Sequence, residues 1–449
     1  MVDPFTTASK HLATVEESRL FGKITGVSGL VLQCEGLPET AIGSRCRVQT
    51  RQNQEFTAEV VGYKEGLVLL MPYAPIEGVG PGCRVYVLGG PPVLKVNNGF
   101  IGRIIDGLGN PIDGKGPLPL SGEDRPFKAL PPPPSTRRPI GKKLDVGVRA
   151  LNTFVPLCRG QRMGIFSGSG VGKSTLLGMI AQFSDAEVNV IALTGERGRE
   201  VMEFIHNSLG EEGLKKSVVV VATGDEPPLM RRQAAYTAMA VAEYFRECGR
   251  QCLLMMDSVT RFAMAQREIG LSAGEPPTTR GYTPSVFSEL PRLLERAGTC
   301  AGEGTITGLF TVLVEGGDLD EPVADAVRGI LDGHIVLDRA LAEQGHFPSI
   351  NILKSVSRAV PQCNSAEENK LVTAARRYYA TYDNMAELIR LGAYKKGSDE
   401  AVDTAIFYHA PLEKYLTQAP EEAATMVDGF ANLADILGEQ SPNAAKKAE

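Results

Sequence analysis

The sequence has few residues that could build a metal centre, and no segment long enough to span a membrane. Its five histidines and eight cysteines are scattered without a C-x-x-C pair or other ligand spacing, which argues against a metal-thiolate site. Its longest apolar runs, such as 218–222 and 253–256, fall far short of the ~18 residues of a membrane-spanning helix. Residues 1–20 lack the apolar core and cleavage site of a secretory signal. We therefore expect a cytoplasmic protein with reduced thiols.

The chain also lacks a strong excess of charge of one sign. Lys and Arg number 47 against 53 Asp and Glu, a net charge of -6. The net charge of the chain therefore does not favour binding to nucleic acid or anionic lipid, and any such contact would need a local cluster of basic residues. A hydrophobic fraction of 43% with 22% charged residues is typical of a folded globular protein and excludes disordered and coiled-coil classes.

The 449 residues predict about three domains at ~150 residues each. Residues 21–92 contain six short β-branched stretches bounded by Gly, Pro or Asn, which is typical of a small β-barrel. We interpret residues 1–20 as a flexible segment. It carries a weak amphipathic stripe that fits a frayed tail as well as a partner contact, formed by Phe5, Ala8, Leu12 and Val15.

Residues 93–362 are predicted to form an α/β core with a parallel sheet. Apolar strand-like runs (MGIFSG, VNVIALTG, SVVVVATG, CLLMMDS, GLFTVLVEG, GHIVLD, SINIL) alternate with helix-like segments such as KSTLLGMIAQFS and RRQAAYTAMAVAEYFRECG. The Gly- and Pro-rich stretch that begins at Phe100, with the later run 131–134, is predicted to be a covering linker rather than a strand or helix. Residues 363–449 contain two amphipathic helix-like runs separated by a Gly-containing break with Lys395 and Lys396, which predicts a small helical domain.

The strongest functional signal is IFSGSGVGKSTLLGMIAQ, a strand followed by a Gly-rich loop and a helix that starts near Lys173. Glycines let backbone N–H groups turn toward a phosphate, and the helix N-terminus adds its positive dipole end. Lys173 supplies a charge for the β and γ phosphates, and the Ser174 hydroxyl suits Mg²⁺. Ser167 replaces the usual first glycine of this P-loop pattern, so unusual backbone angles there are in doubt. The predicted nucleotide-binding residues of the loop are Gly168, Ser169, Gly170, Val171, Gly172, Lys173, Ser174 and Thr175.

Two further strand ends carry candidate catalytic residues. Asp257 ends the run LLMMD, where a carboxylate can hold Mg²⁺ through its water shell, although a cap or turn residue is the common alternative. Glu196 ends VNVIALTGE and can polarise a water for attack on phosphate. From the residues alone, Glu196 beside Arg197, Arg199 and Arg261 fits an ion-pair network equally well.

Six segments together resemble one family. They are SGSGVGKS, ALTGERGRE, LLMMDSVTRFAMAQREIG, GEPPTTRGYTPSVFSELPRLLERAG, GDLDEPVADAVRGILDGHIVLDR and SVSRAV. The chain resembles the type III secretion ATPases, most closely those of flagellar export, which are similar to the catalytic subunit of rotary ATP synthases. The resemblance covers nearly the whole chain from about residue 20 onward, and it implies a RecA-like P-loop core between the barrel and the helical domain.

The resemblance assigns roles to single residues. Glu196 matches the catalytic glutamate, Asp257 the Mg²⁺-associated aspartate, and Phe347 the aromatic that stacks on adenine. Arg358 matches an arginine that reaches into the nucleotide of a neighbouring subunit. Because one chain carries both Glu196 and Arg358, self-association can complete the site, and we expect a homohexameric ring. The implied catalytic set is Lys173, Glu196, Arg197, Arg261 and Arg358, with Ser174 and Asp257 at the metal.

The implied activity is Mg²⁺-dependent hydrolysis of ATP that energises flagellar type III protein export. The resemblance further implies a position at the inner-membrane export apparatus. The implied partners are a regulatory protein at the N-terminal segment, a stalk-like protein at the helical domain, export-gate membrane proteins and chaperone-bound substrates.

Three alternatives remain open at this point. The ATPase chemistry fits a virulence type III secretion system equally well. An RNA-translocating hexamer has a similar core, but residues 21–90 contain few aromatics and little basic clustering, so we expect no nucleic-acid partner and no RNA-stimulated hydrolysis. A non-catalytic ring subunit would lack the carboxylate of Glu196.

Overall fold

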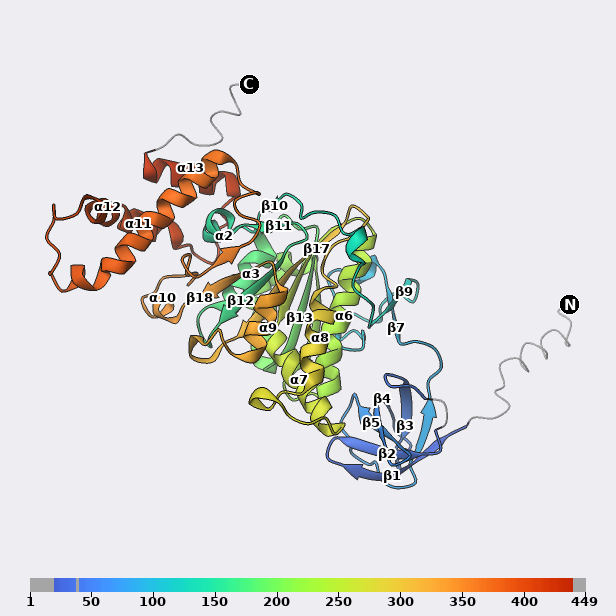
Figure 1. Cartoon of the computed structure of the whole chain (residues 1–449). Coiled ribbons are helices and arrows are strands. Elements are labelled where there is room, and N and C mark those ends of the chain that lie inside the picture. Colours follow the sequence, from blue (N-terminus) through green and yellow to red (C-terminus); the bar gives the residue numbers. More distant parts are fainter. Residues whose placement is uncertain (1–19, 38–39, 439–449) are drawn as a thin grey trace, which may run out of the picture. The chain divides into compact units, whose positions relative to one another are not determined.

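The computed structural model describes residues 20–37 and 40–438 (Figure 1). These residues form two compact units. One contains the described residues up to Pro92 together with 226–230 and 268–276, and the other contains the remainder. Apart from Leu20, the segment predicted to be flexible, with its amphipathic stripe, lies outside the described residues.

The first unit contains a closed antiparallel barrel with the strand order β1-β2-β5-β4-β3-β6. Alternate side chains fill its interior, among them Leu32, Val60 and Leu70, which are fully buried. The prediction of a six-stranded barrel is therefore confirmed. The strands are β1 (Gly22–Ser28), β2 (Val31–Glu35), β3 (Arg45–Gln49), β4 (Glu55–Lys64), β5 (Leu67–Pro72) and β6 (Arg84–Val87).

The second unit is built on a sheet with the order β19-β18-β12-β17-β15-β13-β14-β8, and β16 pairs with β17. All pairs are parallel except those of β16 and β19. The carboxyl ends of the parallel strands therefore meet at one edge, where ligands bind in such folds. The strands are β8 (Ile104–Asp106), β12 (Arg162–Ser167), β13 (Val188–Glu196), β14 (Ser217–Thr223), β15 (Gln251–Asp257), β16 (Gly298–Thr299), β17 (Thr305–Leu313), β18 (Gly333–Leu337) and β19 (Val356–Ser357).

Helices pack around this sheet, and two small ribbons flank it (Figure 1). Parallel strands need crossovers, which most of these helices supply. They are α2 (Arg149–Phe154), α3 (Lys173–Phe183), α4 (Gly198–Glu203), η3 (Phe204–Leu209), α5 (Gly210–Lys215), α6 (Pro228–Glu247), α7 (Val259–Ser272), α8 (Pro284–Leu294), α9 (Pro322–Ile330) and α10 (Arg339–Glu343). The ribbons pair β7 (Val93–Val96) with β9 (Glu123–Pro126), and β10 (Lys143–Leu144) with β11 (Leu157–Cys158). No helix in the described part of the chain is long and apolar enough to cross a bilayer.

The C-terminal helices are α11 (Ala366–Arg390), α12 (Glu400–Leu416) and α13 (Met426–Leu437). Their buried side chains, such as Leu371 and Phe430, belong to the same hydrophobic cluster as the core of the sheet. A capping box of Ser365 and Glu368 starts α11. The sequence analysis missed α12, which contains Pro411, because a proline inside a helical pattern normally argues against one.

Two strand predictions were wrong. The segment predicted to be a linker contains strand β8, which pairs with β14 and buries Ile105 fully. The flanking glycines form the turns on either side of β8. Pairing with β14 stabilises this strand, and the local sequence does not reveal that pairing. Conversely, SINIL forms only an isolated bridge between Leu337 and Ile350. The backbone of this segment turns because the Asn351 side chain accepts hydrogen bonds from the N–H groups of Leu353 and Lys354. The apolar residues of the segment are buried without forming a strand.

A buried ion pair gives a test of the packing of this unit. Arg296 is fully buried, and its guanidinium donates to both oxygens of Glu243 at 2.8 and 2.7 Å and to the carbonyl of Phe127 at 2.6 Å. Arg296→Met leaves the Glu243 carboxylate buried without its partner, and we expect a loss of about 3–5 kcal/mol in unfolding free energy. Urea denaturation measures it. Arg296→Met with Glu243→Leu should recover most of the loss; an equal loss in the double variant contradicts the prediction.

Candidate active site

The P-loop connects the end of β12 to the start of α3. Gly170 and Gly172 have φ angles of 75° and 88°, in the left-handed region, and Gly172 is the N-cap of α3. Ser167 instead is the last residue of β12 and is not among the residues with positive φ. The backbone therefore does not require glycine at this position, and the departure from the usual motif is accommodated.

The P-loop is fixed at one point and open at the others. The Val171 side chain is buried, and its carbonyl accepts a 2.7 Å hydrogen bond from the Ser349 hydroxyl. Ser169, Ser174 and Thr175 are exposed. The first turn of α3, with its free N–H groups, is thus accessible to a phosphate. Sequence reasoning missed Ser349, because it lies far along the chain in a run that looked like a strand.

A cluster of opposite charges lies next to the loop. Lys173 Nζ donates to Asp257 Oδ1 at the end of β15 and lies 3.6 Å from Glu196 Oε1 at the end of β13. Burial opposes the charged form of Lys173, but the two carboxylates outweigh it and raise the pKa of the ammonium group. Asp257 Oδ1 also accepts a 2.7 Å bond from the Thr311 hydroxyl, a contact that the sequence did not reveal. The structure therefore brings Lys173, Glu196 and Asp257 together, and their roles toward nucleotide and metal stay predictions.

The Glu196 carboxyl is largely buried beside charged groups. Burial raises the pKa of its carboxyl, against the lowering effect of Lys173, and the charge of Asp257 raises it further. Within the described residues, Oε1 has no hydrogen-bond partner, so it is available to a water molecule. Arg261, at the start of α7, packs against Gly195: a Cβ added to Gly195 would lie 2.8 Å from the Cβ of Arg261. Arg261 therefore lies beside Glu196.

Arg197 does not join this cluster. Its side chain is 85% exposed, and it pairs with Glu200 at 3.1 Å on the surface of α4. Arg199 likewise pairs with Glu203. Of the three arginines near Glu196 in the predicted network, only Arg261 lies beside it, and the role of Arg197 at a phosphate stays a prediction.

Phe347 lies beside the P-loop, although it is 175 residues from Gly172 in sequence. A Cβ added to Gly172 would lie 3.4 Å from the Phe347 ring, and the ring is 41% exposed. The segment is held from the C-terminal helices: the Phe347 carbonyl accepts from the Gln418 N–H at 2.9 Å, and His346 Nδ1 lies 2.8 Å from Glu413 Oε2. An exposed aromatic face next to the phosphate loop is suited to stack on a base.

Arg358 lies at the opposite end of the sheet. It follows β19, and its N–H donates at 2.9 Å to the carbonyl of Asp332, the residue before β18. Asp332 lies five strand residues from the end of the sheet at which β12 leads into the P-loop. At ~3.3 Å per residue, the backbone of Arg358 is therefore about 17 Å from that end. The guanidinium is exposed beside a surface hollow and makes no hydrogen bond or ion pair within the described residues. Arg358 therefore cannot serve the P-loop of its own chain.

The donor set at the P-loop fits a nucleotide with a hard divalent cation. Ser174 and Asp257 offer oxygen atoms, which Mg²⁺ prefers, and two protein oxygens with phosphate and water complete its usual coordination. Glu196 Oε1 is a buried polar atom left for a ligand or water.

Comparison with protein-family models agrees with this geometry. The nucleotide-binding domain of the ATP synthase alpha/beta family matches residues 147–357, and the beta-barrel domain of that family matches residues 24–89. The T3SS EscN ATPase C-terminal domain matches residues 364–435.

Individual relatives are similar over nearly their whole length. The flagellum-specific ATP synthase of Caulobacter vibrioides is 51% identical, over 94% of this chain and 97% of that protein. The type 3 secretion system ATPase of Xanthomonas euvesicatoria is 44% identical, over 96% of each. The assembled ATPase EscN in complex with its central stalk EscO, from enteropathogenic E. coli, is 41% identical with a TM-score of 0.85, over 93% of this chain and all of that one.

A β-barrel followed along the chain by a P-loop on a parallel sheet places the protein in the ATP synthase alpha/beta family of nucleotide-binding ATPases. Within that family, the C-terminal domain and the relatives place it among the type III secretion ATPases. The resemblance inferred from the motifs is thus confirmed.

Substitution of Glu196 tests its role as the base. Glu196→Gln keeps the shape of the side chain and removes the charge that polarises water, so we expect turnover to fall by about 10²–10⁴-fold. Binding of a fluorescent ATP analogue should stay within a few-fold of the parent. Asp185→Asn, which alters an exposed pair with Arg159, is the matched control; near-normal turnover of Glu196→Gln contradicts the assignment.

Substitution of Phe347 tests base stacking. Base–aromatic stacking is worth ~1–3 kcal/mol, so Phe347→Ala should raise the KM for ATP by about 5- to 150-fold and change kcat much less. Phe347→Tyr keeps the ring and should stay near the parent value. Steady-state kinetics of both variants decide: an equal KM in Phe347→Ala and the parent excludes stacking.

Proposed function

We propose that this chain hydrolyses Mg²⁺-ATP at a site completed between two copies of the chain in a ring: Lys173, Glu196 and Asp257 come from one copy and Arg358 from the next. The observation that carries this proposal is the position of Arg358, exposed and unpaired among the described residues about 17 Å below its own P-loop level. An arginine that stabilises phosphoryl transfer must contact the phosphate, so its target lies on another subunit.

The residues divide the chemistry among them. Glu196 orients a water for in-line attack on the γ-phosphate and accepts its proton. Lys173 leaves its carboxylate partners for the phosphates when a nucleotide enters, since the phosphate oxygens carry more charge. Ser174 and Asp257 would hold the Mg²⁺ that accompanies ATP, and its charge would offset part of the charge of the phosphates. Arg358 of the adjacent copy stabilises the charge that develops on the transferred group.

A hexameric ring with a central stalk is the assembly that we propose. The EscN relative assembles and forms a complex with the central stalk EscO. The turn between α11 and α12 is the candidate stalk contact here, because Lys395 and Lys396 are exposed on it and Leu391 beside them is 74% exposed. A long apolar side chain flanked by cations suits an acidic, partly apolar helix.

We further propose flagellar type III export as the process that the hydrolysis energises. The 51% identity to the Caulobacter vibrioides protein supports flagellar export over a virulence system, whose Xanthomonas euvesicatoria representative is 44% identical. The protein would act at the cytoplasmic face of the inner-membrane export apparatus. Its further partners would be a regulatory protein, export-gate proteins and chaperone-bound substrates.

Mixing two inactive variants tests the shared site. Arg358→Ala and Lys173→Ala should each reduce ATPase activity by about 10³-fold or more. In an equal, random mixture, about a quarter of the sites pair an intact P-loop with an intact arginine, so activity should recover to about that share of the parent rate. Steady-state hydrolysis measures it, and native mass spectrometry verifies that mixed rings form. Mixed rings without any recovery would falsify the trans role of Arg358.

A further inference from the structure

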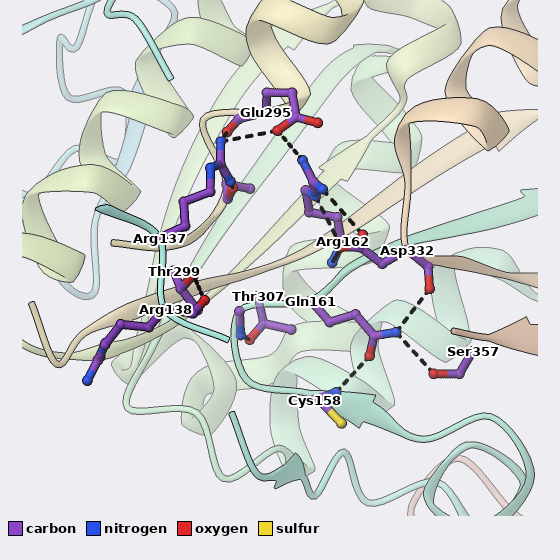
Figure 2. A network of polar contacts seen from close by, with 12 residues as sticks. Arg137, Arg138, Cys158, Gln161, Arg162, Glu295, Thr299, Thr307, Asp332 and Ser357 are labelled. Carbon is purple, nitrogen blue, oxygen red and sulfur yellow. Dashed lines mark hydrogen bonds and ion pairs between the residues drawn. The ribbon is translucent and has the colours of Figure 1, made fainter. Parts of the chain in front are cut away.

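A polar network that includes Asp332, whose carbonyl accepts from the Arg358 N–H, lies at the end of the sheet opposite the P-loop. Figure 2 shows its side chains. Arg162, the first residue of β12, donates to both carboxylate oxygens of Asp332: its backbone N–H and Nε reach Oδ2 at 3.0 and 3.1 Å, and Nη2 reaches Oδ1 at 3.3 Å. The Asp332 N–H in turn donates to the Arg162 carbonyl at 2.8 Å. Asp332 is therefore tied to β12 through both its backbone and its side chain.

Gln161 joins this pair to the strand that carries Arg358. Its fully buried side chain donates from Nε2 to the Asp332 carbonyl at 3.1 Å and to the Ser357 hydroxyl at 3.0 Å, and it accepts from the Cys158 N–H at 2.9 Å. The Asp332 carbonyl is also the acceptor of the Arg358 N–H. Both residues on either side of the Ser357–Arg358 peptide bond are thus hydrogen-bonded to this network.

The network is anchored on its outer side as well. Glu295 contacts the Arg162 guanidinium and, at 3.1 Å, Nη2 of Arg137 from the Pro-rich segment (Figure 2). Gly333, which follows Asp332, has no room for a side chain, because a Cβ would lie 2.4 Å from the carbonyl of Val356. β18 and β19 therefore approach closely just before Arg358, and the backbone there has little freedom.

We propose that Arg162, Asp332 and Gln161 are positioning residues for Arg358, which hold its backbone where the exposed guanidinium can enter the site of the adjacent copy. This inference rests on the proposed function, since it requires Arg358 to act in trans. None of the three side chains is near the P-loop of its own chain, so their effect passes through Arg358. A misplacement of about 1 Å lowers a rate by ~10²-fold, which makes the position of this backbone decisive.

Asp332→Asn is the first test, because it keeps the shape and removes the charge that binds Arg162. We expect kcat to fall by about 10–10²-fold with the KM for ATP within twofold. Arg159→Gln is the matched control: Arg159 lies two residues before Gln161 but pairs with Asp185 outside the network, and its kcat should stay near that of the parent.

Complementation distinguishes positioning of Arg358 from a general structural defect. Asp332→Asn subunits keep their own P-loop, so mixing with Lys173→Ala subunits, which contribute intact arginines, should restore activity. Mixing with Arg358→Ala subunits should not. The opposite pattern, recovery only with Arg358→Ala, places the defect at the P-loop of the same chain and overturns the proposal.

Two further results complete the experiment. If Arg358→Ala and Lys173→Ala fail to complement each other, the shared site is wrong, and the positioning role is wrong with it. If that pair complements but Asp332→Asn behaves like Lys173→Ala in the mixtures, only the positioning role is wrong. If Asp332→Asn does not assemble, Ser357→Ala takes its place in the same mixtures. It removes the hydroxyl that accepts from Gln161 and donates to the Pro156 carbonyl. Parent-level activity of assembled Ser357→Ala and Gln161→Leu rings then overturns the proposal.

Discussion

The ion pair between Lys173 and Asp257 is the contact on which the site depends. It joins the P-loop to the edge of the sheet and keeps a buried ammonium group charged, with Glu196 as a second carboxylate nearby. Buried opposite charges hold each other while the site is without phosphate, because an unpaired buried charge is strongly destabilising. In the proposed mechanism, the phosphates of a nucleotide would take the place of the carboxylates as partners of Lys173, which would leave Asp257 to the metal and Glu196 to a water molecule. The same three residues would then serve both the packing of the site and its chemistry.

The strand β12 relates the two halves of the proposed shared site. Its carboxyl end leads into the P-loop, and its first residue, Arg162, holds Asp332 and through it the backbone of Arg358. In the proposed ring, the arginine that a subunit contributes to its neighbour and the phosphate loop that it uses itself would lie beside opposite ends of this buried strand. A parallel sheet buried on both faces is stiff, so the separation of the two groups within each copy would be fixed.

The sequence was informative wherever the signal was local. The P-loop, the start of α3 at Lys173 and the strand ends at Glu196 and Asp257 follow from runs of neighbouring residues, and the six barrel strands follow from alternation and turns. Contacts made across the chain were not visible: Ser349 on the Val171 carbonyl and Thr311 on Asp257 come from segments more than fifty residues away. Strand β8 and helix α12 were missed for the same reason, because packing against distant elements outweighs a glycine-rich or proline-containing local sequence. Arg197 shows the converse, since proximity in sequence to Glu196 did not place its side chain in the cluster.

The orientation of β12 has a consequence for a closed ring of identical copies. In the proposed ring, each copy would face one neighbour with the end that receives an arginine and the other neighbour with the end that contributes one. Such an interface is heterologous, so the ring would have a direction even though all its members are alike. Because the phosphate loop and the arginine of one copy lie beside opposite ends of a six-residue strand, the polarity of β12 would set the direction in which each copy contributes its arginine.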